Sequence, residues 1–222
     1  MKRKQQGFTL IEIAIVLVII GLLLGGVLKG QELINNARVR NVIAQQDSIK
    51  TAYFSFQDRY RALPGDYNLA ATNIPGVTVN GNGNGQITGN EQVYAWNHMN
   101  KAGFLTGTYN GVPAGGNISD ASNSPVNAYG GVLQIIFDNS YADTATAADV
   151  HNIKTGNNIP ASIIAEIDRK VDDGNAQQGT FRFSPWTATG AIAPTATDCY
   201  TAATGAWNAV GGAANCGGAS LL

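Results

Sequence analysis

The chain has 222 residues, of which only 13% are charged, and its formal net charge is −1. It contains no run of lysine and arginine of the kind that marks a nucleic-acid-binding surface, so the sequence indicates no nucleic-acid partner. With two histidines and two cysteines in the whole chain, no Ser-His-Asp, Cys-His or histidine-metal set can be assembled. We therefore expect a protein that is not an enzyme.

The N-terminal segment has the pattern of a membrane helix. Lys2, Arg3 and Lys4 precede Phe8–Leu28, a run of 21 residues in which Glu12 is the only ionisable side chain. At about 1.5 Å per residue, a helix of this length crosses the hydrocarbon core of a bilayer. The basic residues favour a cytoplasmic N-terminus with the rest of the chain exported. Because a carboxylate in an apolar span costs several kcal/mol, we expect Glu12 to have a function.

The segment Gly7–Ile13, with the letters GFTLIEI after a short basic leader, resembles the class III signal of type IV prepilins and type II secretion pseudopilins. The resemblance implies that a prepilin peptidase removes residues 1–7 by cutting between Gly7 and Phe8, and that the new amino terminus of Phe8 is methylated. It also implies that Glu12 pairs with the N-terminal ammonium of a neighbouring subunit. An ordinary secretory signal and a plain signal anchor are the alternatives.

The same resemblance implies where such a protein is found and what it meets. Before assembly it is a single-pass protein of the inner membrane, in contact with an inner-membrane assembly platform. After assembly it is one subunit of a homo-oligomeric helical filament, either an extracellular pilus or a periplasmic pseudopilus.

The apolar run is predicted to be the first half of a longer helix. Its second half, residues 29–61, has an apolar stripe with steps of three or four, and Pro64 ends it. The stripe consists of Ile49, Ala52, Tyr53, Phe56 and Tyr60. We expect a leader at 1–7, a transmembrane or filament-core segment at 8–28, and an exported globular domain at 62–222.

A Gly- and Asn-rich loop follows the long helix. Its residues Asn80, Asn82, Asn84 and Glu91 stand at positions 1, 3, 5 and 12 of a calcium loop of the EF-hand kind. Three of these side chains are neutral amides where that motif prefers carboxylates, which predicts weak affinity. A loop with no bound ion explains the same residues, and no other cofactor is indicated.

Four further elements are predicted in the exported domain. A short amphipathic helix lies at about 91–105 and includes His98, interpreted as a solvated or core residue. A second helix opens at Ile159-Pro160 and closes at Gly174, and strands are expected at 131–137 and 180–183. Asp168, Asp172 and Asp173 could form an acid cluster, but two acids beside a glycine at a helix end are interpreted as a solvated terminus.

The two cysteines, Cys199 and Cys216, lie in the C-terminal region. In an exported domain they meet an oxidising compartment, so a disulfide is the default expectation. A loop of this size gives about 3 kcal/mol in the chain-entropy description. A disulfide-bounded C-terminal loop also resembles the one found in many type IV pilins.

These features predict an α+β fold of the ladle-shaped pilin type, with a long helix on a small antiparallel sheet and a disulfide-bounded C-terminal loop. The expected function is that of a structural subunit of a type IV pilus or pilus-like filament. The alternatives are a minor or tip pilin that binds a surface, a type II secretion pseudopilin, and a membrane-anchored calcium-binding module.

Overall fold

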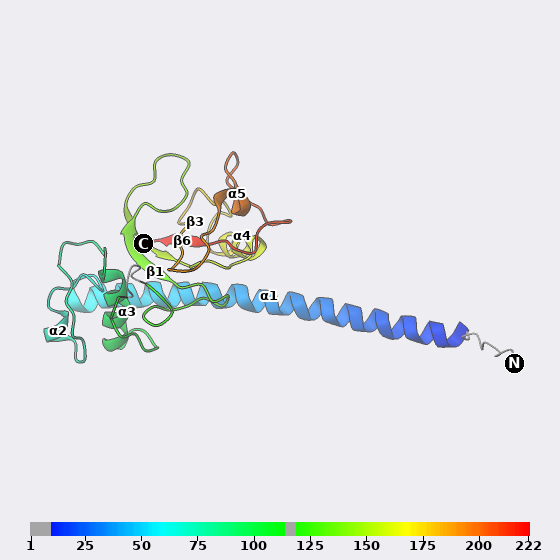
Figure 1. The fold of residues 1–222 in the computed structure, drawn as a ribbon, viewed down its shortest axis with the longest axis horizontal. Coiled ribbons are helices and arrows are strands. Elements are labelled where there is room, and N and C mark those ends of the chain that lie inside the picture. The colour runs from blue at the N-terminus through cyan, green and yellow to red at the C-terminus, as the bar shows by residue number, and fades with distance from the viewer. Residues whose placement is uncertain (1–9, 114–118) are drawn as a thin grey trace. The chain divides into compact units, whose positions relative to one another are not determined.

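A computed structural model describes residues 10–113 and 119–222 of the chain. Its longest element is helix α1, Leu10–Tyr60, and Figure 1 shows this helix without interruption. The chain divides into two compact units, Met1–Arg38 and Val39–Leu222, with the division inside α1. The predicted combination of one long helix and a small antiparallel sheet is confirmed.

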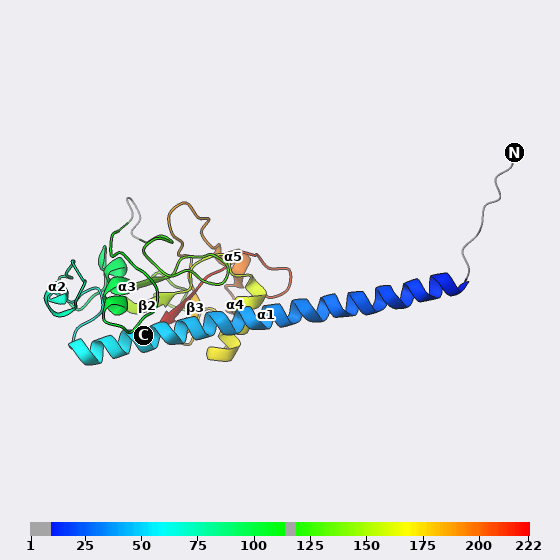
Figure 2. The same cartoon turned by 90° about the horizontal axis from the view of Figure 1, so that it is seen from below.

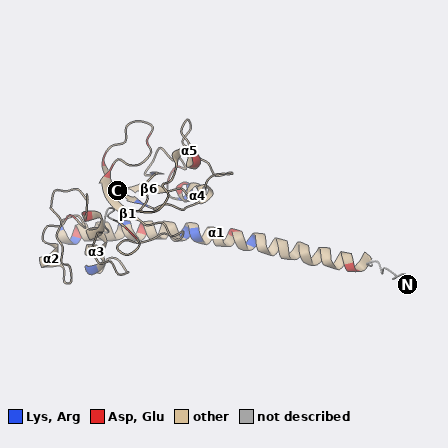
Figure 3. Cartoon of the chain, in the orientation of Figure 1, with Lys and Arg blue, Asp and Glu red and all other residues tan. Residues whose placement is uncertain are grey.

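Within the first unit, the described residues form only the first part of α1. Their side chains are almost all exposed, including Leu10 at 92%, and no charged residue lies between Glu12 and Lys29. Figure 3 shows this stretch in tan. By length and composition, α1 is the one helix in the described part of the chain that can cross a membrane.

The second unit has a core in two parts. In one part, Val39 and Val42 of α1 belong to a cluster with the apolar face of α4 (Ala161–Val171) and the disulfide. In the other, Ile49, Tyr53 and Phe56 belong to a cluster with α3 (Glu91–Lys101) and the first two strands. The predicted stripe of α1 is therefore the face that packs on the domain.

A four-stranded antiparallel sheet lies in this unit, with the strand order β1-β2-β6-β3. The strands are β1 (Gln134–Asp138), β2 (Val150–Lys154), β6 (Gly218–Leu221) and β3 (Phe181–Phe183). A separate pair of short strands, β4 (Tyr200–Thr201) and β5 (Ala206–Trp207), lies within the disulfide-bounded loop. The C-terminal strand thus completes the sheet by joining β2 to β3.

Two short helices complete the unit, α2 (Ala70–Asn73) and α5 (Ala196–Cys199). Figures 1 and 2 show α2 and α3 at one end of the unit and α4 and α5 at the other. Pro160 caps α4, and its carbonyl accepts hydrogen bonds from the amides of Ile163 and Ile164. The helix predicted at about 91–105 ends at Lys101, followed by turns.

Candidate functional site

The first candidate site is the start of α1. The predicted cleavage and methylation residues, Gly7 and Phe8, lie outside the described residues. Glu12 lies in the first turn of α1 and is exposed. Its carboxylate is therefore on the surface of a helix whose other side chains as far as Leu28 carry no charge.

The apolar surface of this segment of α1 is large. Side chains exposed by about two thirds to nine tenths recur along it at Leu10, Ile11, Leu17, Leu22 and Leu28. Removing one such side chain from water is worth about 1.5–3 kcal/mol, so this surface needs lipid or protein around it. The arrangement presents an apolar helix with one acid near its beginning.

The second candidate site is the loop with the calcium-type spacing. Both oxygens of the buried Glu91 carboxylate accept backbone hydrogen bonds, from the amides of Asn82 at 2.9 Å and Thr88 at 3.0 Å. Oδ1 of Asn80 accepts from the amide of Ala71, Oδ1 of Asn82 from that of Asn84, and Oδ1 of Asn84 from that of Gln86. Hydrogen bonds within the protein thus engage all four predicted ligands, and calcium binding by this loop stays a prediction.

One residue of this loop region was not recognised in the sequence. Asp66, 4% exposed, accepts hydrogen bonds from the amides of Asn84 at 3.0 Å and Gly85 at 2.9 Å. It therefore ties the start of the connection to the middle of the loop. The only sequence signal was its place two residues after Pro64, the residue predicted to end the long helix.

His98 is a core residue. It is completely buried, and its ring stacks on Phe56 at a centroid distance of 6.3 Å. The amide of Gly65 donates to Nδ1 at 3.1 Å, so the proton of the neutral ring is on Nε2, which lies 3.0 Å from the carbonyl oxygen of Val79. Burial lowers the pKa of His98 from 6.5 to about 4. This histidine therefore holds two loop segments together in its neutral form.

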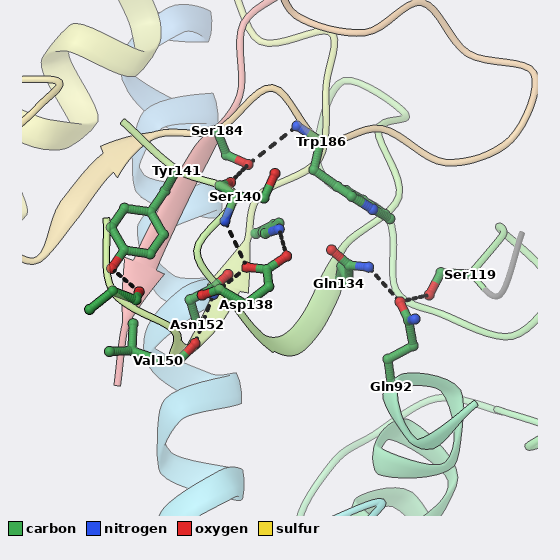
Figure 4. A network of polar contacts seen from close by, with 12 residues as sticks. Gln92, Ser119, Gln134, Asp138, Ser140, Tyr141, Val150, Asn152, Ser184 and Trp186 are labelled. Atoms are coloured by element: carbon green, nitrogen blue, oxygen red, sulfur yellow. Dashed lines mark hydrogen bonds and ion pairs between the residues drawn. The ribbon is translucent and has the colours of Figure 1, made fainter. Parts of the chain in front are cut away.

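A buried polar network crosses the first two strands. Lys154 is completely buried, and its ammonium bonds to Asp138 Oδ2 at 2.5 Å. Asn152 donates to Oδ1 of the same carboxylate at 2.9 Å, and the amide of Ser140 donates to it at 3.2 Å. Figure 4 shows Asp138 with Asn152 and Ser140. The network fixes the end of β1, because the Asp138 carboxylate is hydrogen-bonded through both of its oxygens.

Two other predictions can be compared directly with the structure. Cys199 and Cys216 form a disulfide, as predicted. Of the three acids near Gly174, Asp173 is exposed and Asp172 half-buried, whereas Asp168 is completely buried and is not part of a solvated terminus. It lies on the inner face of α4, where its carboxylate accepts a hydrogen bond from Trp207 Nε1 at 2.6 Å.

Comparison with known proteins identifies the N-terminal segment. Residues 2–28 match the family model described as the prokaryotic N-terminal methylation motif. No curated protein and no solved structure matches the chain. The matched motif is the class III signal peptide of type IV pilins and pseudopilins, and it indicates that the chain is anchored in a membrane by its apolar helix.

Proposed function

We propose that this chain is a structural subunit of a type IV pilus or pilus-like filament, freed from its leader by prepilin peptidase and polymerised through its N-terminal helix. The observation that carries this proposal is the methylation motif at residues 2–28 together with the helix that follows it. That helix exposes its apolar side chains and carries one acid in its first turn. The motif itself is typical of proteins that assemble rather than catalyse.

Assembly exchanges one apolar environment for another. In the membrane, lipid surrounds the exposed apolar side chains of α1; in a filament, helices of neighbouring subunits replace the lipid. Apolar burial therefore changes little, and polar pairing in a medium of low dielectric constant gains importance. Glu12 is the one ionisable side chain from Phe8 to Leu28, and the ammonium at Phe8 of the neighbouring subunit is the partner that the signal implies.

The decisive test replaces Glu12 by alanine in the cells that assemble the protein. We expect Glu12→Ala to insert in the membrane at wild-type amounts and to give at least about a tenfold loss of filaments, since loss of one charged pair in apolar surroundings costs a few kcal/mol. Sheared filaments and membrane fractions are measured by immunoblot.

Glu32→Ala is the matched control. Glu32 is an exposed acid on the same helix, paired with Lys29 at 2.7 Å and outside the apolar run. We expect this variant to assemble normally. Normal filament yield from Glu12→Ala would contradict the proposed role of the acid.

Mass spectrometry of the mature protein tests the processing step separately. The expected chain begins at a methylated Phe8, with residues 1–7 absent. A mature chain that keeps its leader would instead favour a membrane-anchored binding module, because a filament subunit needs the free amino terminus of Phe8.

A further inference from the structure

Three acids come together where α4 ends. One carboxylate oxygen from each of Asp168, Asp172 and Asp173 lies within 4.8 Å of the other two. Asp168 is buried, Asp172 is half-buried and Asp173 is exposed. The group therefore runs from the interior of the domain to its surface.

The buried member has an oxygen without a partner. Asp168 Oδ2 accepts the indole N–H of Trp207, but Oδ1 is buried and has no hydrogen-bond partner in the described part of the chain. The amide of Gly174 lies close enough to favour the charged form of this carboxyl, although it does not reach hydrogen-bond geometry with Oδ1. A buried carboxylate oxygen that lacks a partner costs free energy, so a missing ligand is indicated at this point.

The two other acids are held in place by the backbone. Asp172 Oδ2 accepts hydrogen bonds from the amides of Thr180 and of Phe181, the latter at 2.8 Å. The chain can approach this carboxylate so closely because Gly179, with φ +69°, has no side chain to collide with it. Asp173 Oδ1 accepts from the amide of Asn175 at 2.8 Å. Both carboxylates are thus preorganised.

The electrostatics of the group favour a cation. Burial raises the pKa of Asp168 to about 6, and the negative charges of Asp173 and Asp172 act in the same direction to a smaller extent. Asp168 and Asp172 are four residues apart at the C-terminal end of a helix, where negative charges repel each other and the helix dipole disfavours them. The neighbouring basic residues bond elsewhere: Arg169 Nε to the carbonyl of Ala165, and Lys170 to Glu166.

We propose that Asp168, Asp172 and Asp173 bind one hard divalent cation, with calcium as the preferred ion. Carboxylate oxygens are the ligands that calcium takes in proteins, and its six to eight positions tolerate the irregular geometry of a helix end and a turn. The exposed side of Asp173 leaves room for water to complete the coordination. This site is separate from the 80–91 loop and is independent of filament assembly.

The bound cation would join three parts of the domain. Asp168 belongs to α4, Asp172 is bonded to the amide that begins β3, and Trp207 belongs to the disulfide-bounded loop. Neutralising the three acids removes their repulsion and so strengthens the attachment of the loop to α4. We expect calcium to raise the melting temperature of the domain.

Calorimetric titration of the full chain in detergent micelles with calcium chloride tests the proposal. We expect a saturable binding event whose apparent Kd rises at least about tenfold in Asp173→Asn and in Asp168→Asn, since each loses one ligand charge. Asp173 is exposed, so its variant retains the fold even where Asp168→Asn does not, and circular dichroism verifies this. Asp198→Asn, an exposed acid of α5, is the matched control with an unchanged Kd.

Three results would overturn the site. The first is no saturable calcium binding by the wild-type chain up to about 10 mM, well above the range of weak extracellular modules. The second is an unchanged Kd in a folded Asp173→Asn variant. The third is a single binding event that Glu91→Gln abolishes and that both aspartate variants retain, because that event belongs to the 80–91 loop.

Discussion

Acidification should destabilise the exported domain through His98. The neutral ring accepts a hydrogen bond from the amide of Gly65 at Nδ1, and its Nε2 proton points to the carbonyl of Val79. Protonation would place a second N–H on Nδ1, opposite the N–H of Gly65, and would put a charge in the core beside Phe56. The folded state therefore resists protonation.

The sign and size of the effect follow from the pKa. Burial lowers the pKa of His98 from 6.5, the value expected in the unfolded chain, to about 4. Between these values the unfolded chain binds the proton and the folded domain does not, so stability falls as the pH falls. The neutral His98 therefore contributes about 3 kcal/mol to the free energy of unfolding. This contribution is fully present above pH 6.5 and is lost as the pH approaches 4.

Urea unfolding of the full chain in detergent, followed by the fluorescence of the buried Trp96, measures this contribution from about pH 7.5 to pH 4. We expect His98→Gln to be less stable than the wild type at neutral pH and to show a pH dependence that is shallower by about 3 kcal/mol. His151→Gln is the matched control. The pKa of His151 is also lowered by burial, but the residue is half-buried and should flatten the curve less. Parallel curves for the wild type and His98→Gln would refute the reasoning, as would a His98 pKa near 6.5 by NMR.

Two further predictions concern the stability of the domain. Lys154→Met should destabilise it by about 3–5 kcal/mol in urea unfolding, because the Asp138 carboxylate then loses the ammonium with which it is paired. The double variant Lys154→Met with Asp138→Leu should recover most of this loss. A Lys154→Met variant as stable as the wild type would contradict this prediction. Replacing both Cys199 and Cys216 by serine should cost about 3 kcal/mol in the same assay, and equal midpoints for the double variant and the wild type would show that the bridge adds no stability.

The sequence predicted those parts of the fold that depend on local patterns. The long helix followed from an apolar run and an apolar stripe of helical period, and α4 followed from Pro160 and the spacing of its isoleucines. Strand β3 followed from the alternation in Thr180–Phe183 and covers Phe181–Phe183. Each of these signals lies within one stretch of the chain.

The parts that were missed depend on partners far away in the sequence. Strand β6, Gly218–Leu221, has no β-branched or alternating pattern, and it is a strand because β2 and β3 pair with it on both sides. Strand β2 ends in Lys154, which a sequence pattern assigns to the surface. Its burial depends on Asp138, 16 residues earlier. The sheet order could therefore not be derived from local preferences.

The same reason explains the errors at the candidate sites. The spacing of the 80–91 loop was visible, but the participation of Asp66 was not, because its bonds to Asn84 and Gly85 cross 18 and 19 residues. The burial of Asp168 was not predicted, because its neighbours Arg169 and Asp172 are polar and give no local sign of it. Its burial depends on Trp207, 39 residues later.

The two units of the chain differ in where their apolar side chains lie, and this difference bears on function. In the unit Val39–Leu222, asparagine and aspartate side chains close the loops by accepting backbone hydrogen bonds, and the core is formed within the unit. In the described part of the first unit, large apolar side chains are exposed from Leu10 onward. An apolar helix surface of that kind is stabilised by lipid or by other helices packed around it. Substitutions in the apolar run should therefore change insertion and assembly and leave the unfolding of the domain unaltered, whereas substitutions at His98 or Lys154 should change that unfolding directly.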